Sequence, residues 1–404
     1  MSARAPHILF FAFTYSVDGD SQWLEEDLVQ ALLRRGARVD VVVFDFREPR
    51  PSGIQRSSTK SLRVFSVGPE TSSHNDFQRA LHLLSTLRRL WSFSRHVARS
   101  HDTYDLCVST SPAMLSGGVP GWLRRRRRCR RNLVILWDFF PTHQLEIGRL
   151  RSQALGSVLA RLEAAAIRSA DVISLPSDRF AEVFRRLHGE SGSQRTTIIP
   201  NWAGNGPVPA SAIARSGSTF RAVFGGQLAP GRGLHTILDA AKILRDQDHQ
   251  GIEIVIAGSG PDAEILKGRI RTEHIDNVSI LGRLPRDEYL RLLGDCDAGL
   301  VVTVPNVSVP SSPAKVSDYL RCGLPIIACV EAASDFGDMI ESVGCGISVP
   351  AGSPADLARA LVAVRAAMTT GEAAAMGERG LAYYEAELTA DRAAERVLAL
   401  LPQY

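Results

Sequence analysis

Residues 305–329, PNVSVPSSPAKVSDYLRCGLPIIAC, form the stretch from which the fold and the site are predicted. The run 311–313, SSP, is typical of a helix start, because a hydroxyl can cap a helix and proline fits its first turn. The helix should end at 322–323, CG, since glycine adopts the left-handed conformation that closes a helix. The apolar run 324–329 then predicts a buried parallel strand.

A capped helix start at the edge of a parallel sheet predicts an anion site. Its free N–H groups and its dipole both favour negative charge, and phosphate is the first ligand to expect. We therefore expect Ser311 and Ser312, at the helix start, and Lys315 and Asp318, on the helix, to lie at such a site. The alternative is one more helix and strand of an α/β sheet.

The three strands that precede this stretch also end in glycine-rich turns. Residues 220–224 lead into GGQLAPGRG, residues 252–257 into GSGP and residues 278–281 into GRLP. The fourth strand, 297–304, runs directly into the opening stretch. Backbone N–H groups in such turns can approach a phosphate closely, so four turns in order predict a phosphate site.

The first half of the chain opens with a strand over 8–13, a helix and a second strand over 38–46, which predicts a parallel sheet. No GxGxxG follows the first strand, which argues against an NAD enzyme. Two later strands end beside Ser111 and Asp138. Ligands gather at the carboxyl ends of strands in such sheets, so both side chains are candidates for a cleft, although an Asp there is often only a cap.

Length and composition predict a soluble protein of two domains. The chain has 404 residues, 45% hydrophobic and 22% charged, and residues 203–218 have the composition of a linker. Six scattered cysteines without a CxxC pair indicate a reduced, cytoplasmic protein. No apolar run is long enough to span a bilayer, so membrane contact would be peripheral, on the inner leaflet of the cell membrane.

The net charge is +4, and the positive charge is unevenly distributed, because seven arginines lie within residues 124–131. This cluster predicts either a surface that meets anionic lipid or a solvated loop, and the two are left open. No nucleic-acid motif accompanies it, so nucleic acid is not expected as a partner.

Motifs along nearly the whole chain resemble glycosyltransferase family 4, retaining enzymes with the two-domain GT-B fold. In the second half these are FGGQLAPGRGLHTILDA (224–240), IVIAGSGPDAEIL (254–266), VSILGRLPRDEYLRLL (278–293) and SPAKVSDYLRCGLPIIA (312–328). In the first half STSPAM (109–114), WDFFPTHQLEIG (137–148), LEAAAIRSADVISLPS (162–177) and IPNW (199–202) resemble the bacterial branch that builds surface polysaccharides and lipid-linked sugars.

The resemblance implies an α/β protein with two Rossmann-like, doubly wound parallel-sheet domains that face each other across a cleft. Residues 1–203 would bind the acceptor, with a C-terminal helix at about 386–404 that packs back on them, and residues 204–385 would bind the nucleotide sugar. The chain would transfer a sugar from a nucleotide-diphosphate sugar, expected to be a UDP-sugar, with retention. The acceptor would be a glycan, a glycolipid or a small molecule.

The resemblance also implies roles for individual residues. The Arg and Lys that hold the diphosphate in this family fall on Gln227 and Arg232. The family's second glutamate, which binds the ribose hydroxyls, falls on Asp318, and its first falls on Pro310, where no carboxylate exists. Losing one cation from a site that stabilises a leaving diphosphate costs several kcal/mol unless another replaces it. Lys315 is the expected substitute.

In the first domain Asp138 would face the sugar or the acceptor hydroxyl, where many relatives carry a histidine. The predicted catalytic residues are therefore Asp138, Arg232 and Lys315. The predicted nucleotide-sugar-binding residues are Gly226, Gln227, Arg232, Gly258, Gly260, Arg283, Leu284, Ser311, Ser312, Lys315 and Asp318. No cofactor and no metal are expected, since no DxD triplet is present.

Two other functions stay open. The missing carboxylate at Pro310 and the glutamine at 227 fit a catalytically weak GT-B auxiliary protein that binds a nucleotide or a partner glycosyltransferase. A sugar-nucleotide epimerase would need acids and bases at the nucleotide site, and the sequence offers no convincing set.

Overall fold

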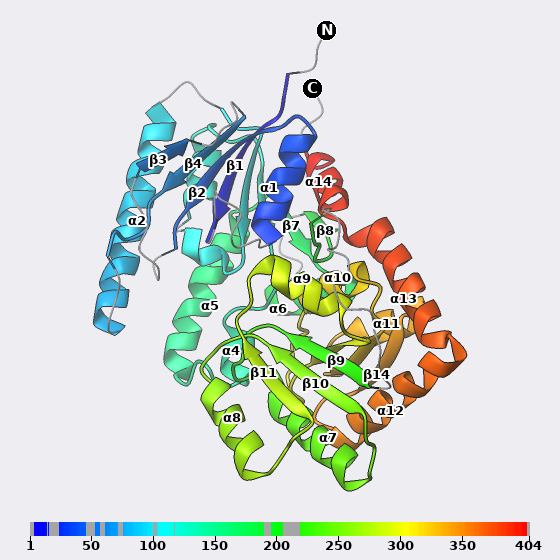
Figure 1. Cartoon of the computed structure of the whole chain (residues 1–404). Helices are drawn as coiled ribbons and strands as arrows, with labels where there is room; N and C mark the ends of the chain where they lie inside the picture. Colours follow the sequence, from blue (N-terminus) through cyan, green and yellow to red (C-terminus); the bar gives the residue numbers. More distant parts are fainter. Residues whose placement is uncertain are drawn as a thin grey trace. The chain divides into compact units, whose positions relative to one another are not determined.

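The structure is a computed structural model that describes residues 4–13, 15, 24–45, 53–56, 61–71, 76–99, 103–116, 118–189, 195–204 and 219–401. These residues form two compact units (Figure 1). The first unit contains Met1–Pro141, Gln153–Pro200 and Ala390–Tyr404, and the second contains Thr142–Ser152 and Asn201–Thr389. The predicted linker lies, from residue 205 to residue 218, outside the described residues.

The first unit is built on a sheet whose described strands follow the order β3-β4-β2-β1-β5-β6-β7-β8. The neighbours pair in parallel except β3 and β4, which pair antiparallel at one edge. The central strands are buried along their whole length, as parallel strands covered on both faces should be. The bounds are β1 His7–Ala12, β2 Arg38–Val43, β3 Gly53–Arg56, β4 Leu62–Ser66, β5 Leu106–Thr110, β6 Asn132–Ile135, β7 Val172–Leu175 and β8 Arg195–Ile198.

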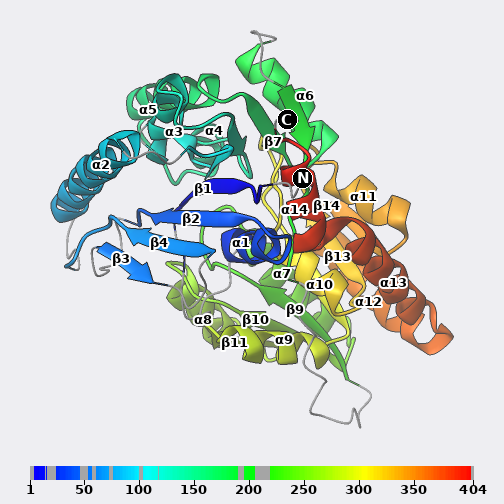
Figure 2. The ribbon, with the colours of Figure 1, turned by 90° about the horizontal axis from the view of Figure 1, so that it is seen from above.

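Helices cover both faces of this sheet (Figure 2). Leu9 and Phe11 of β1 pack with residues of α2 and α3 on one face, while α1 packs against the last helix, α14, on the other. The bounds are α1 Leu24–Arg34, α2 Asp76–Arg99, η1 Ala113–Ser116, α3 Val119–Arg125, α5 Gln153–Arg168, α6 Asp178–His188 and α14 Ala390–Leu398.

The second unit has a parallel sheet of six described strands in the order β11-β10-β9-β12-β13-β14. The strand order reverses beside β9, so the carboxyl ends of β9 and β12 lie at the kind of switch point where α/β proteins bind ligands. The bounds are β9 Phe220–Gly225, β10 Ile252–Ala257, β11 Val278–Gly282, β12 Ala298–Val302, β13 Ile326–Val330 and β14 Gly346–Pro350.

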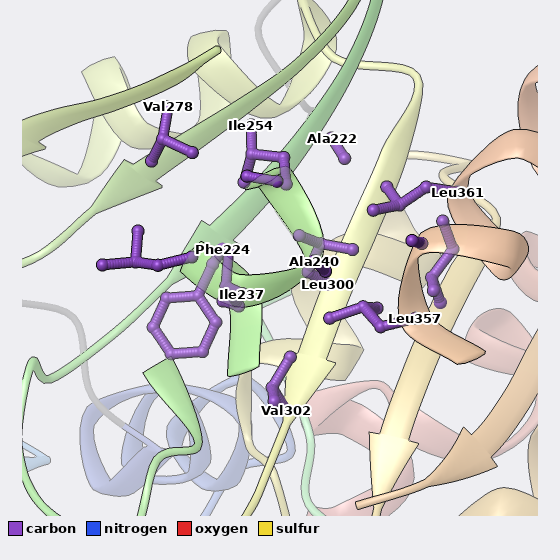
Figure 3. Packing of buried hydrophobic residues seen from close by; sticks show 14 of the residues in the cluster. Ala222, Phe224, Ile237, Ala240, Ile254, Val278, Leu300, Val302, Leu357 and Leu361 are labelled. Atoms are coloured by element: carbon purple, nitrogen blue, oxygen red, sulfur yellow. The ribbon is translucent and has the colours of Figure 1, made fainter. Parts of the chain in front are cut away.

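Alternate residues of these strands build two cores. Ala222 and Phe224 pack with side chains of α7 and α12 on one face (Figure 3), and Val223 packs with α9, α10 and α11 on the other. The helices are α4 Thr142–Glu146, α7 Leu234–Asp246, α8 Ala263–Thr272, α9 Arg286–Gly294, α10 Lys315–Arg321, α11 Phe336–Val343, α12 Pro354–Thr370, α13 Glu372–Tyr383 and the π-helical turn η2 Tyr384–Leu388.

Besides Thr142–Ser152, which the sequence assigned to the first domain, the second unit contains Asn201–Thr389, whereas the sequence placed these boundaries at 203/204 and at about 386. Hydrogen bonds explain the observed positions. The Ala203 N–H donates to the Leu388 carbonyl at 3.0 Å, and the Tyr384 hydroxyl donates to the Gly204 carbonyl at 2.9 Å. In the first unit Arg34, the last residue of α1, pairs with Asp391, and Arg35, the next residue, pairs with Glu395. These ion pairs hold α14 there.

Among the described helices, none combines the length and the apolar character needed to cross a bilayer.

Candidate active site

The glycine-rich turns of the second unit are joined by backbone hydrogen bonds. The Gly226 N–H donates to the Ala257 carbonyl and the Leu228 N–H to the Ser259 carbonyl, both at 2.9 Å. The Gly258 N–H donates to the Gly282 carbonyl at 2.8 Å. The turns after β9, β10 and β11 therefore form one connected surface at the carboxyl edge of the sheet.

Two glycines are required by this close approach. A Cβ on Gly258 would lie 1.8 Å from the Gly226 carbonyl oxygen, and a Cβ on Gly260 would lie 2.1 Å from the Leu228 carbonyl oxygen. Both distances are far inside van der Waals contact with backbone atoms, which cannot move aside as the end of a side chain can. The pattern that predicted Gly226, Gly258 and Gly260 at the site thus reflects the packing of turn on turn.

Two predicted cations, Lys315 and Arg232, lie at this surface. The Lys315 ammonium is 3.5 Å from the centroid of the Phe224 ring, and its Nζ is 3.7 Å from where a Cβ of Gly226 would lie. Burial, and secondly the charge of Arg232, hold the pKa of Lys315 well below its usual range. An anion beside this side chain would raise that pKa and so favour the protonated, charged form.

The serine pair is held from two sides. The Ser311 N–H and hydroxyl both donate to one carboxyl oxygen of Glu331 at 2.7 Å. The Asn201 side-chain amide donates to the Ser312 hydroxyl at 2.8 Å and to its carbonyl at 3.1 Å. Ser317 of α10 donates in turn to the Asn201 carbonyl at 3.0 Å. The loop before α10 is therefore fixed by side chains that lie far away in the sequence.

These contacts correct the predicted helix start. Helix α10 begins at Lys315, after Ala314, and neither serine caps it. The Ser311 hydroxyl is engaged by Glu331, and Ser312 by Asn201, so residues 311–313 form part of the loop. The predicted end is confirmed, because Gly323 follows the helix with a φ of 66°.

Asp318, the predicted ribose ligand, forms a two-point ion pair with Arg286 at the start of α9. The Arg286 Nη1 and Nη2 donate to the two carboxylate oxygens at 2.6 and 2.5 Å. Each carboxylate oxygen can accept a second hydrogen bond, so the pair fixes the carboxylate without exhausting it. Next to it the Tyr319 hydroxyl accepts the Gly225 N–H at 2.8 Å, which ties α10 to the end of β9.

The remaining predicted residues of the second unit lie around this surface. Gln227 and Arg283 are exposed, and Leu284 is half-buried. The segment after the WDFFP motif also belongs to this unit. Its Glu146 accepts the Ser308 N–H at 3.0 Å, and its Ile147 lies where a Cβ on Gly231 would come within 2.8 Å of it. The structure therefore gathers every predicted nucleotide-sugar residue in the second unit.

Asp138 lies in the first unit, at the carboxyl end of β6. The neighbouring strand β5 ends beside Ser111, whose hydroxyl accepts the Trp137 N–H at 3.1 Å. Ser111 and Asp138 therefore follow neighbouring strands at one edge of the sheet, and their place in a ligand cleft stays a prediction.

Two buried glutamates stand at the same edge of the first unit. Glu163 of α5 accepts the N–H groups of Ala113 and Met114, each at 2.8 Å. Burial raises its pKa to about 7, against these hydrogen bonds, and the charge of Asp138 adds to the rise. Glu25 of α1 accepts the Thr110 hydroxyl at 3.4 Å, and burial raises its pKa to about 7 as well.

The sequence missed Glu331, Arg286 and Asn201 as site residues. Their partners lie 20, 32 and 111 positions away, so no local pattern contains both members of a contact. One signal was available for Glu331, which is a single carboxylate directly after the apolar strand 326–330. In the described residues no three His, Cys, Asp or Glu side chains are arranged to hold a metal ion.

Comparison with protein families finds two matches in tandem. Residues 26–202 match the glycosyl transferase 4-like domain, and residues 212–380 match glycosyl transferases group 1. The chain belongs to glycosyltransferase family 4. It is a glycosyltransferase with the GT-B fold, two Rossmann-like domains in one chain, and each of the two units described above contains most of one matched domain.

Solved structures share this fold over nearly their whole length. Sucrose-phosphate synthase from Thermosynechococcus elongatus has a TM-score of 0.71 at 17% identity, with 98% of each chain covered. HepE from Anabaena, solved with UDP-glucose, has a TM-score of 0.66 at 16% identity, with 97% of this chain and 98% of that chain covered. WaaG, a glycosyltransferase involved in lipopolysaccharide biosynthesis, has a TM-score of 0.66 at 14% identity, with 98% and 100% covered. No curated protein matches the sequence.

Proposed function

We propose that this glycosyltransferase moves a sugar from a UDP-sugar to an acceptor hydroxyl with retention of configuration. The observation that carries the proposal is the pairing of Lys315 and Arg232 over interlocked glycine turns at the carboxyl edge of the second unit. A diphosphate leaving group gains negative charge in the transition state, and preorganised cations and amides stabilise that charge. The uridine base is supported by HepE, which was solved with UDP-glucose.

Different residues would bind different parts of the donor: the diphosphate, the ribose, the base and the sugar. Lys315 and Arg232 would neutralise the diphosphate, with the Ser312 hydroxyl and the amides of the glycine turns as further donors. Ser311 would line the site without donating to the diphosphate, because its N–H and its hydroxyl both donate to Glu331. Asp318 would accept the ribose hydroxyls, and the backbone at Arg283 and Leu284 would face the base. Asp138 would face the sugar or the acceptor hydroxyl. We expect no metal to be required.

A ligand screen tests the donor. A ligand that binds only the folded state raises the melting temperature, so UDP, GDP, dTDP and ADP sugars are compared by thermal shift. The sugar that stabilises most is then incubated with the protein, with and without EDTA, and free nucleotide and sugar are measured. We expect UDP-sugars to give the largest shift and EDTA to leave turnover unchanged. Stabilisation by another nucleotide alone would refute the uridine assignment.

An acceptor made at a membrane would require the protein to reach an anionic lipid surface, and the cluster Arg124 to Arg131 was the predicted contact. Most of its members are engaged within the chain. Arg124 pairs with Asp171 at 2.9 Å and Arg130 with Asp105 at 3.6 Å. The Arg128 and Arg131 guanidinium groups bond to the Ala98 and Leu400 carbonyls, and Arg126 stacks 5.3 Å over Trp122.

Arg125 and Arg127 are exposed, and among the described residues their side chains make no such contact, so they keep the lipid proposal open. Each arginine near an anionic surface contributes about 1 kcal/mol. Co-sedimentation with anionic and neutral vesicles tests it. We expect binding to anionic vesicles at low salt, weakened in Arg125→Ser/Arg127→Ser and retained better in Arg124→Ser, the matched control. No sedimentation at low salt would exclude the surface as a lipid contact.

A further inference from the structure

Glu331 is a carboxyl group buried beside the predicted diphosphate site, outside every motif that the sequence offered. It directly follows β13 and is 3% exposed. One of its oxygens accepts both the N–H and the hydroxyl of Ser311 at 2.7 Å. Its other oxygen accepts the hydroxyl of Thr303, and its own N–H donates to that hydroxyl oxygen at 3.1 Å. Both oxygens therefore hold neighbouring loops.

Thr303 extends this connection to the glycine-rich turn. It directly follows β12 and is itself buried. A Cβ on Gly233 would lie 2.3 Å from the Thr303 carbonyl oxygen, and Gly233 has a φ of 63°. Gly233, the last residue of the glycine-rich turn, therefore packs against Thr303. Arg232 is the residue before it. Glu331 thus contacts the serine loop directly and the arginine-bearing turn through Thr303.

We propose that Glu331 is a positioning residue that sets the spacing between Ser311 and Arg232 around the donor diphosphate. This inference rests on the proposed function. The chain has no carboxylate at position 310, which is proline. Glu331, at the end of β13, instead brings a carboxylate into contact with the next residue, Ser311. Held in this way, the serine loop and the arginine turn are in place before the donor arrives, and preorganised donors stabilise a developing charge best.

Glu331→Gln tests the position with the least change of shape. The amide keeps one acceptor oxygen for Ser311 but offers N–H groups to Thr303 in place of the second oxygen. Ser311→Ala removes the hydroxyl from the other side of the contact and serves if Glu331→Gln folds poorly. Glu341→Gln, an exposed carboxyl of α11, is the matched control.

The readout is the ratio of two affinities measured by calorimetry. The probes are the nucleoside diphosphate that stabilises the wild type most, chosen among UDP, GDP, dTDP and ADP, and its monophosphate. We expect Glu331→Gln and Ser311→Ala to weaken diphosphate binding at least tenfold and monophosphate binding less than twofold, while Glu341→Gln changes neither. General loosening of the fold would weaken both ligands alike.

Three outcomes decide the matter. A selective loss for the diphosphate in either folded variant supports the positioning role. Wild-type binding of a diphosphate with unchanged or equally weakened affinities in both folded variants overturns this inference alone. If the wild type binds none of the four diphosphates, the proposed function falls, and this inference falls with it.

Discussion

The two units place opposite kinds of titratable side chain, acidic in one and basic in the other, at the carboxyl ends of their central strands. The first unit places Glu25, Glu163 and Asp138 there, and the two glutamates have pKa values of about 7. The second unit places Lys315 and Arg232 there, while its carboxyls are engaged, Asp318 by Arg286 and Glu331 by hydroxyl and amide donors. The basic edge suits an anionic diphosphate, and the acidic edge suits a neutral hydroxyl. The contrast shows that two similar folds differ in the side chains at the corresponding edge of the sheet, which are acidic in the first unit and basic in the second.

The largest expected effect concerns the acidic edge. Because the folded-state pKa of Glu163 is about 7 and its ordinary value is 4.5, the folded protein binds the extra proton between these pH values. The raised pKa of Glu163 therefore contributes to the free energy of unfolding. This contribution is fully present below about pH 4.5 and is lost as pH rises through about 7, a change of roughly 3 kcal/mol.

Glu163→Gln should reduce the pH dependence of stability, because glutamine does not titrate, while Glu25, whose pKa is also about 7, still contributes to it. Urea denaturation at pH 5 and pH 8 measures it, with Glu182→Gln, an exposed residue of α6, as control. An unchanged pH dependence in Glu163→Gln would remove Glu163 from the acidic edge as a titrating group.

The second effect concerns the basic edge. Arg232→Ala and Lys315→Ala should each lower sugar transfer about a hundredfold, or about 2.7 kcal/mol, because each removes a cation from the leaving diphosphate. As pH rises, Lys315 of the free wild type should lose its proton earlier than an ordinary lysine, because its pKa is lowered. Over that pH range diphosphate binding should take up a proton, since the anion raises the pKa again.

Calorimetry in pairs of buffers that differ in ionisation enthalpy, repeated at increasing pH, detects that proton. Lys315→Met should abolish the uptake, and Lys242→Met, on α7, should not. Full turnover in either alanine variant would exclude that residue from the site.

The third effect tests whether the basic edge depends on turn packing. Gly258→Ala should destabilise the second unit by about 2 kcal/mol, because its Cβ would lie 1.8 Å from the Gly226 oxygen. Gly268→Ala is the matched control, since its Cβ meets nothing within 4 Å on helix α8. It should stabilise the helix by about 0.5–1 kcal/mol. Equal unfolding midpoints for the two variants would contradict the packing of these turns.

The smallest effect concerns Asp318. Asp318→Asn keeps the shape but loses the charge that the ribose hydroxyls and Arg286 would share, so nucleotide affinity should fall about tenfold, or about 1.4 kcal/mol. Calorimetry with the preferred nucleotide measures this, and Asp338→Asn on α11 is the control. If the affinity of Asp318→Asn equals that of the wild type, the ribose assignment is wrong.

The basic edge was more predictable from the sequence than the acidic edge. Glycines at strand ends indicate close backbone approach, so the turns after β9, β10 and β11 could be predicted. The alternation of strands and helices predicted a parallel sheet in each unit. The serine hydroxyls were wrongly assigned to a helix cap, because they bond instead to Glu331 and Asn201, which are distant in the sequence. Burial of Glu163 and Glu25 depends on packing between helices and the sheet, which periodicity does not specify. The antiparallel edge strand β3 was missed for the same reason.

The return of α14 to the first unit makes that unit depend on the order of synthesis. Arg34 and Asp391 form an ion pair across 357 positions. At about 5–20 residues per second, α1 leaves the ribosome roughly 20 to 70 s before its partner helix exists. During that interval the face of α1 that α14 will cover is open to other chains and to chaperones, while the second unit has time to form. Translation speed, and not only sequence, therefore governs how long the first unit waits for its final helix.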